Sequence, residues 1–136
     1  MKIALYPGSF NPFHLGHREV VEKALQVFDR VIVAKGINPA KANKVMPWHV
    51  KLPPGAEYIE FTGLTAELAK KLGACAIIKG IRNAQDLEDE RAQQFYNETR
   101  LGMEIPTFYV LASPGLMSVS STAERAIMKF TKGKSK

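Results

Sequence analysis

Two spacings of apolar residues alternate along this chain. Runs of consecutive apolar residues, such as Ile3-Ala4-Leu5 and Val31-Ile32-Val33, are typical of strands buried on both faces. Between them, apolar residues recur three or four positions apart, as at Val20, Val21, Ala24, Leu25 and Phe28, which is the helical period. The runs predict five strands, at Lys2–Tyr6, Arg30–Ala34, Glu57–Phe61, Cys75–Ile78 and Thr107–Leu111.

Helices are expected between these strands, with an irregular stretch from Gly36 to Pro54. Four helices are predicted. The first begins at Arg18, and the second contains Leu64, Leu68 and Leu72 and ends at Gly73. The third spans about Ala84 to Leu101, and the fourth runs from a Ser120 or Ser121 cap through about Met128. Strands that alternate with helices predict an α/β fold. We therefore expect a Rossmann-like open parallel sheet of about five strands with helices on both faces.

Composition narrows the class of protein further. The 136 residues suit a single domain, 1–136, with a short basic tail at about 131–136. The one cysteine, Cys75, fits a reducing, cytoplasmic setting, and its apolar neighbours predict a buried structural thiol. No apolar stretch reaches the ~20 residues of a membrane span, so no membrane partner is expected. The net charge of +6 owes much to the tail, and no basic and aromatic stripe indicates a nucleic-acid partner.

The first candidate binding segment runs from Tyr6 to His17, where a strand ends and a helix begins. Its sequence is Tyr-Pro-Gly-Ser-Phe-Asn-Pro-Phe-His-Leu-Gly-His. In an open α/β sheet this junction is where ligands bind, and the free N–H groups and dipole of a helix N-terminus favour a phosphate. His14 and His17 are close enough in sequence to reach the same phosphate.

The second segment is Lys79-Gly80-Ile81-Arg82-Asn83, after the fourth predicted strand. Arg82 can hold phosphate oxygens with two N–H groups, and Lys79 supplies a point charge. The acidic residues that follow, Asp86, Glu88, Asp89 and Glu90, equally fit a basic turn that its neighbours neutralise. The sequence alone leaves both interpretations open.

The third segment, Ser118 to Arg125, offers hydroxyls and helix N-terminal amides to an anion, although by itself it is also an ordinary helix cap. Lys41 adds a cation in the loop after the second strand. All these segments follow strands whose carboxyl ends share one edge of a parallel sheet. Together they predict a site for a polyphosphate, with a nucleotide as the preferred ligand. The sequence has neither of the common glycine-rich phosphate loops and no metal-ligand spacing.

These motifs resemble those of the nucleotidyltransferase superfamily that carries an H/T-x-G-H signature. Within it, the chain from Lys2 to about Met128 is similar to the phosphopantetheine adenylyltransferase family. The segments that carry the resemblance are Tyr6–Pro12, Asn38–Lys41, Ile78–Asn83 with its acidic helix, and Val119–Thr122. The resemblance implies transfer of the adenylyl group of ATP to 4'-phosphopantetheine, with dephospho-coenzyme A and pyrophosphate as products.

The resemblance also implies roles for particular residues. His17, Lys41 and Arg82 would be catalytic, and Ser9, Lys41, Thr65 and Lys79 would contact the acceptor. ATP would be held by Ser9, Phe10, His14, His17, Gly80, Ile81, Arg82, Glu90, Leu116, Met117, Ser118, Val119, Ser120, Ser121 and Thr122. Mg²⁺ would bridge the phosphates without an assigned protein ligand, and the family's hexamer implies a homo-oligomer.

Three departures from the family pattern keep other functions open. Lys79 stands where the family usually has arginine, Asp89 where it has tyrosine, and His14 where it has threonine. His14 is typical of related mononucleotide adenylyltransferases, so the alternative is a nicotinamide or nicotinate mononucleotide adenylyltransferase of NAD biosynthesis. Cytidylyl transfer and a nucleotide- or nucleic-acid-binding protein without catalysis are further alternatives.

Overall fold

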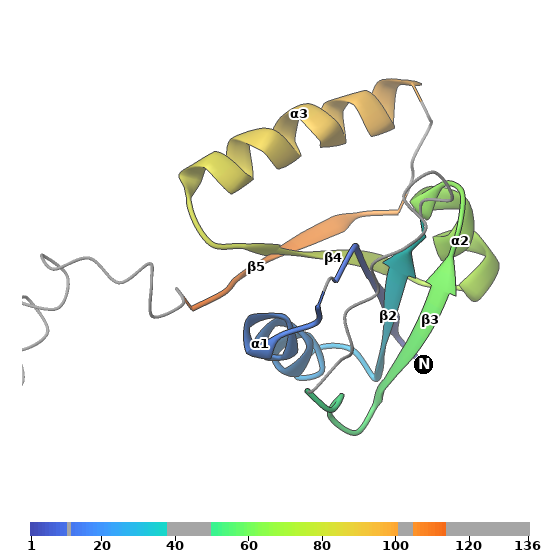
Figure 1. Ribbon diagram of the computed structural model, residues 1–136. Helices are drawn as coiled ribbons and strands as arrows, with labels where there is room; N and C mark the ends of the chain where they lie inside the picture. The colour runs from blue at the N-terminus through green and yellow to red at the C-terminus, as the bar shows by residue number, and fades with distance from the viewer. Residues whose placement is uncertain (11, 38–49, 101–104, 114–136) are drawn as a thin grey trace, which may run out of the picture.

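The computed structural model describes residues 1–10, 12–37, 50–100 and 105–113, with only the backbone described for 95–100. Figure 1 shows strands and helices in alternation along the chain. Their order is β1 (Ile3–Gly8), α1 (Leu15–Ala24), β2 (Arg30–Gly36), β3 (Ala56–Phe61), α2 (Thr65–Leu72), β4 (Ala76–Ile81), α3 (Ala84–Arg100) and β5 (Thr107–Leu111). The alternation predicted from the sequence is confirmed for these elements.

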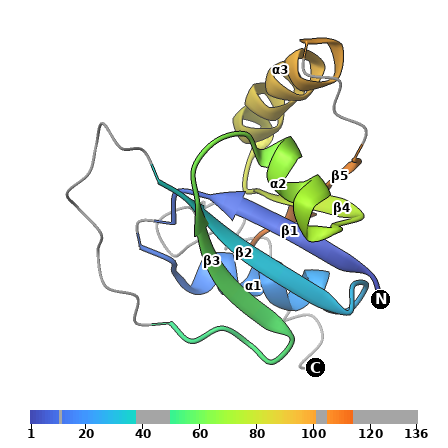
Figure 2. The ribbon, with the colours of Figure 1, turned by 90° about the vertical axis from the view of Figure 1, so that its right-hand side faces the viewer.

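The five strands form one parallel sheet in the order β3-β2-β1-β4-β5. Figure 2 shows β1 between β2 and β4. Chain order reverses at β1, because β2 and β3 extend the sheet to one side and β4 and β5 to the other. The gap between β1 and β4 is therefore the switch point at which open α/β sheets bind ligands.

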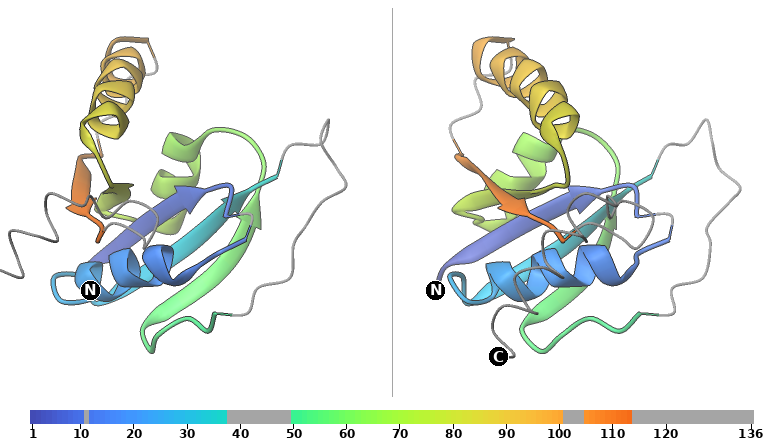
Figure 3. Two further views of the ribbon diagram at one scale, coloured as in Figure 1. Left: turned by 60° about the vertical axis from the view of Figure 1, so that its left-hand side comes forward. Right: turned by 90° about the vertical axis from the view of Figure 1, so that its left-hand side faces the viewer.

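The core has two layers, one on each face of the sheet. Ala4, Val31 and Ile78 face α1 and pack with its Val20 and Val21. Their neighbours along the strands, Leu5, Ile32, Ala34 and Ile77, point the other way and pack against Ala69 of α2. Because both faces are covered, the central strands are continuously apolar, as in the sequence. Figure 3 shows α1 on one side of the sheet and α2 and α3 on the other.

Several elements extend further than the sequence predicted. β1 continues through Pro7 to Gly8, β2 through Lys35 to Gly36, and β4 through Lys79 and Gly80 to Ile81. The apolar pattern marked only the buried centres of these strands, whereas backbone pairing carries each strand on through charged residues, proline and glycine. α1 likewise begins at Leu15 rather than Arg18.

One prediction about a side chain is wrong. Cys75 is exposed, although its neighbours Ala74 and Ala76 are buried. It lies just before β4, where its N–H donates to the carbonyl of Ile3 at 2.8 Å. At this entrance to the sheet the backbone is paired but the side chain faces solvent, so an apolar neighbourhood in sequence did not ensure burial. The predicted last helix, from Ser120 or Ser121 to Met128, and the basic tail lie outside the described residues.

Two glycines at neighbouring strand ends give a matched test of the packing. A Cβ at Gly8 would lie 2.9 Å from Cζ of the buried Phe10 ring, whereas at Gly36 the nearest atom is 3.8 Å away. We expect Gly8→Ala to lower the free energy of unfolding by about 1–3 kcal/mol, because the ring must move. Gly36→Ala should change it little. Urea unfolding measures both, and equal losses in the two variants would contradict the predicted contact.

Candidate active site

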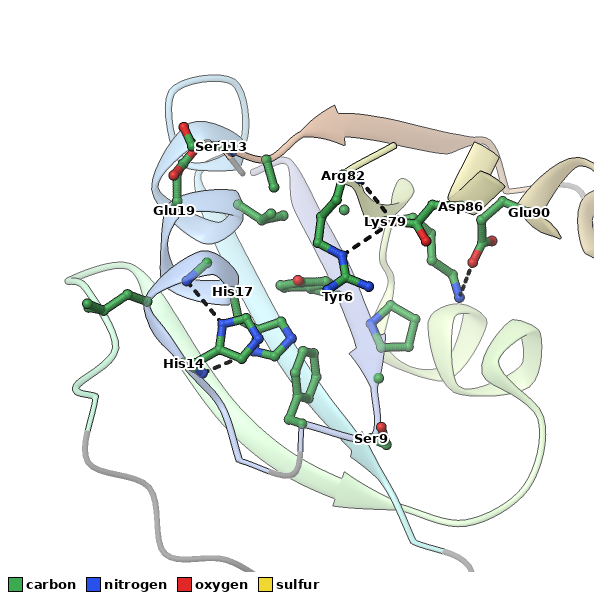
Figure 4. Close-up of a pocket in the computed structure, with 18 of the residues that line it drawn as sticks. Tyr6, Ser9, His14, His17, Glu19, Lys79, Arg82, Asp86, Glu90 and Ser113 are labelled. Atoms are coloured by element: carbon green, nitrogen blue, oxygen red, sulfur yellow. Dashed lines mark hydrogen bonds and ion pairs between the residues drawn. The ribbon is translucent and has the colours of Figure 1, made fainter. Parts of the chain in front are cut away.

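A crevice of ≈ 840 Å³ opens at the carboxyl ends of β1 and β4. The two strands pair at Ala4 with Ala76 and at Leu5 with Ile77, whereas β1 stays paired with β2 as far as Gly8. Pro7, which has no N–H to donate, lies beyond the last β1 residue that pairs with β4. The crevice is lined from β1, the following turn, the start of α1, the end of β4 and the first turns of α3 (Figure 4).

Two histidines form the N-terminus of α1. His14 is the N-cap residue, and its Nδ1 accepts from the N–H of Gly16 at 3.1 Å. His17 lies in the first turn, and its Nδ1 accepts from the N–H of His14 at 3.0 Å. The two rings stack with their centroids 3.6 Å apart. This reciprocal capping uses donors that a helix N-terminus would otherwise leave unsatisfied.

The capping geometry fixes the tautomer of both rings. A ring nitrogen that accepts a hydrogen bond carries no proton, so in the neutral imidazole the proton is on the other nitrogen. Both histidines are therefore Nε2–H tautomers, and their Nε2–H groups are not used by the cap. As crevice-lining residues they offer two donors to a ligand from one helix turn.

Electrostatics keep both rings neutral. Burial, followed by the nearby His14 and Arg82, lowers the pKa of His17 from 6.5 to about 4. Burial and then Arg82 also lower the pKa of His14. Desolvation and neighbouring cations both disfavour a charged imidazole. At neutral pH these side chains are hydrogen-bond donors without a net charge.

Aromatic residues fix the position of the His17 ring. Phe10 meets it edge-on, with the ring centroids 5.0 Å apart, and Phe13 lies at 5.4 Å. Phe10 also meets Tyr6 edge-on at 5.0 Å. Phe10 has a positive φ of 40°, uncommon for a non-glycine residue, and its side chain is only 3% exposed. The turn before α1 thus packs Phe10 against the histidine.

Across the crevice, two cations meet carboxylates from α3 (Figure 4). Nζ of Lys79 lies 3.8 Å from Oε1 of Glu90, and Nε of Arg82 lies 3.4 Å from Oδ2 of Asp86. Asp86 also accepts from the backbone N–H of Arg82 at 3.1 Å. Both interpretations of this segment hold in part, since the cations line the crevice and acidic residues accompany them. Pairs this long and solvent-accessible contribute little stability, so an incoming anion can replace the carboxylates.

Gly80 brings the two sides of the crevice together. A Cβ at this position would lie 3.1 Å from Cγ2 of Val20 in α1 and 3.6 Å from the hydroxyl of Tyr6. The absent side chain lets α1 pack close to β4. The histidines and the Arg82 segment therefore belong to one crevice rather than to separate surfaces.

Most predicted site residues in the described part of the chain lie in this crevice. Its lining includes Ser9, Phe10, His14, His17, Lys79, Gly80, Arg82 and Glu90. Ile81 is buried at the end of β4, and Thr65 begins α2, so neither lines the crevice. Lys41 and the segment from Leu116 to Thr122 fall outside the described residues.

Sequence reasoning missed an anchor between α1 and the end of β5. Oε1 of Glu19 accepts from both the backbone N–H and the hydroxyl of Ser113, at 2.9 and 2.8 Å. Lys23 pairs with Glu19 at 3.0 Å and donates to the carbonyl of Leu111 at 2.7 Å. These hydrogen bonds hold the pKa of Glu19 below its usual value. Glu19 and Ser113 both line the crevice, but their wide separation in sequence gave no signal.

Neither a metal centre nor a membrane-spanning helix is present among the described residues. No group of three or more His, Cys, Asp or Glu side chains in this part of the chain is placed to hold a metal ion. No helix among the same residues is long and apolar enough to cross a membrane.

Comparison with known proteins assigns the chain to a class. The family model described as cytidylyltransferase-like matches residues 5–127, so the chain is a member of this nucleotidyltransferase class. A solved structure, the lipopolysaccharide core biosynthesis protein from Thermoplasma volcanium, shares the fold. Its TM-score is 0.53 at 13% identity, over 81% of this chain and 96% of that one.

Sequence relatives define the family within the class. A phosphopantetheine adenylyltransferase of Cytophaga hutchinsonii is 38% identical over 95% of this chain and 91% of its own length. One from Caldanaerobacter subterraneus is 35% identical over 96% of this chain and 86% of its own, and one from Flavobacterium psychrophilum is 34% identical over 95% and 89%. The chain belongs to the phosphopantetheine adenylyltransferase family.

The low pKa of His17 predicts how stability depends on pH. Between pH 6.5 and about 4 the unfolded chain binds a proton at this residue that the folded chain does not. The free energy of unfolding should therefore be at its full value above pH 6.5. It should fall as the pH drops toward 4, by about 1–2 kcal/mol for this partly exposed ring. Urea unfolding from pH 4 to 7 measures the slope. His17→Asn should flatten it, and equal slopes in both proteins would contradict the assignment.

Proposed function

We propose that this protein transfers the adenylyl group of ATP to 4'-phosphopantetheine, giving dephospho-coenzyme A and pyrophosphate. The observation that carries the proposal is the crevice in which two neutral imidazoles offer Nε2–H donors and Arg82 supplies a cation. The family membership supplies the substrate pair.

The chemistry needs few groups from the protein. The acceptor's phosphate is already ionised at neutral pH, so it attacks the α-phosphorus of ATP without a general base. A bond forms from the acceptor's phosphate oxygen to the α-phosphorus, and the bond from that phosphorus to the bridging oxygen breaks, so pyrophosphate leaves with the electron pair. Catalysis then consists of positioning the two phosphates and stabilising charge that develops on the transferred group.

The crevice residues suit these tasks. We assign the Nε2–H of His17 to the α-phosphate, because its ring is held by a hydrogen bond and by two aromatic rings. His14 and Arg82 would contact the remaining phosphates. Phe10 and Gly80 would shape the ATP site beside Glu90, and Ile81 would support it from its buried position at the end of β4. Ser9, Lys41 and Lys79 would hold the acceptor. Thr65, at the start of α2, would contact the acceptor only if that molecule extends beyond the crevice.

The segment from Leu116 to Thr122 would complete the ATP site. The anchor from Glu19 to Ser113 supports this assignment, since it ties the chain just before this segment to the helix that carries the histidines. The proposed contacts are to phosphate oxygens, from hydroxyls and backbone N–H groups.

Mg²⁺ is the proposed cofactor. It is usually held by substrate phosphates, water and one or two carboxylates rather than by a protein cage. The crevice fits this mode, because Asp86, Asp89 and Glu90 line it without forming a three-ligand cluster among the described residues. The ion would neutralise charge on the leaving pyrophosphate. A homo-oligomer, a hexamer by family resemblance, and a cytoplasmic location complete the proposal.

A panel of acceptors tests the function. With ATP and Mg²⁺, we expect pyrophosphate release on addition of 4'-phosphopantetheine, and none with pantetheine, which lacks the attacking phosphate. Nicotinamide mononucleotide and nicotinate mononucleotide test the alternative that His14 suggested, and CTP in place of ATP tests cytidylyl transfer. Turnover with a mononucleotide but not with 4'-phosphopantetheine would reject the proposed acceptor. Salt-sensitive nucleic-acid binding without turnover would favour a non-catalytic protein.

A pair of variants separates the two functions of His17. In His17→Asn the amide oxygen can replace Nδ1 as acceptor for the His14 N–H, but the Nε2–H donor is lost. We expect kcat to fall about 100-fold or more while the Kd for ATP changes less than about threefold, because the donor acts mainly in the transition state. His17→Gln, whose amide N–H reaches nearer the Nε2 position, should recover part of kcat. A raised KM for ATP with kcat intact would refute this role.

A further inference from the structure

Lys35, in β2, is a buried cation for which the described residues supply no partner. Lys35 is 5% exposed. Its Nζ atom is buried and has no hydrogen-bond partner within the described residues. No ion pair of the described part of the chain includes it. Lys35 was not predicted as a site residue, because a lysine after Val31-Ile32-Val33-Ala34 signalled the end of the strand.

The surroundings of Lys35 offer little compensation for burial. Its register partner on β3 is Glu60, but that carboxylate accepts from the hydroxyl of Tyr58 at 2.7 Å and lies in an exposed residue. Removing an ammonium group from water without giving it a partner is energetically costly. Packing alone does not explain why the fold buries a lysine at this position.

The position of Lys35 indicates which ligand it serves. Along β2 it alternates onto the same face as Val31 and Val33, the face that α1 covers. Its register partner on β1 is Gly8, which is followed by Ser9, and both of these residues line the crevice. Lys35 itself does not line the crevice. The four-carbon stem of a lysine is longer than the ~4.8 Å between neighbouring strands, so a change of side-chain rotamer would bring Nζ to the end of β1.

We propose that Lys35 binds a phosphate group of a bound substrate at the carboxyl ends of β1 and β2. A compact ammonium group is suited to phosphate oxygens. The negative charge of the ligand would offset the cost of burying Nζ, which has no hydrogen-bond partner in the described part of the chain. The inference rests on the proposed function, in which both ATP and the acceptor carry phosphates. Either phosphate has the chemistry required, and the experiment distinguishes them.

Lys35→Met tests the proposal, because it keeps the length of the side chain and removes its charge. Lys71→Met, in the exposed part of α2, removes the same charge away from the crevice. Calorimetric titrations with ATP, 4'-phosphopantetheine and pantetheine measure which affinity changes. We expect Lys35→Met to weaken binding of one phosphate-bearing substrate about tenfold or more, with pantetheine unaffected. Lys71→Met should match the unsubstituted protein.

The ligand-free proteins provide a second readout. Removing an unpaired buried charge should raise the melting temperature of Lys35→Met, whereas a lysine that only supports the fold would lower it on removal. Unchanged affinities for both ATP and 4'-phosphopantetheine would overturn the proposal, whatever the melting temperature. If Lys35→Met does not fold, Lys35→Gln replaces it in the same titrations.

Failure of this inference is distinguishable from failure of the proposed function. If the unsubstituted protein releases no pyrophosphate with 4'-phosphopantetheine, the function is wrong. Titrations with ATP and with inorganic phosphate then still test Lys35. Loss of phosphate affinity in Lys35→Met supports the anion site, and equal affinities reject it.

Discussion

The structure depends on the early end of pairing between β1 and β4. Beyond Leu5 and Ile77 the two strands no longer pair, while β1 remains on β2 to Gly8. This divergence at the switch point creates the crevice, and it leaves the ends of both strands free to present side chains. The turn after β1 then carries Phe10 and the histidines to one side, and β4 carries Lys79 and Arg82 to the other.

Local hydrogen bonds decide what those side chains can do. A histidine pair near a cation could act as a base, an acid or a donor, and spacing does not discriminate between these roles. The cap of α1 does, because both Nδ1 atoms accept backbone hydrogen bonds and both Nε2 atoms therefore carry protons. Burial and Arg82 act in the same direction by keeping the rings neutral. The same contacts that begin the helix thus select donors for an anionic ligand.

The sequence predicted the parallel α/β architecture because periodicity reports which face of each element is buried, and that information is local. It predicted the histidines, Lys79 and Arg82 because a parallel sheet brings strand ends to one edge. It could not predict the anchor from Glu19 to Ser113, which joins residues far apart in sequence. The prediction that Cys75 is buried was wrong, and the burial of Lys35 was not predicted, for a related reason: burial depends on neighbours across the sheet rather than along the chain.

The cations of the site differ in how their charge is compensated, and this difference has a functional consequence. Lys79 and Arg82 have carboxylates from α3 within 4 Å, so ligand binding there exchanges one weak pair for another. Lys35 has no such partner among the residues that the structure describes, so an anion that reaches it displaces none of them. We therefore expect the preference for a phosphate over an uncharged group to be stronger at Lys35 than at Lys79 and Arg82. At Lys35 no ion pair within the described residues has to be broken before the phosphate can pair.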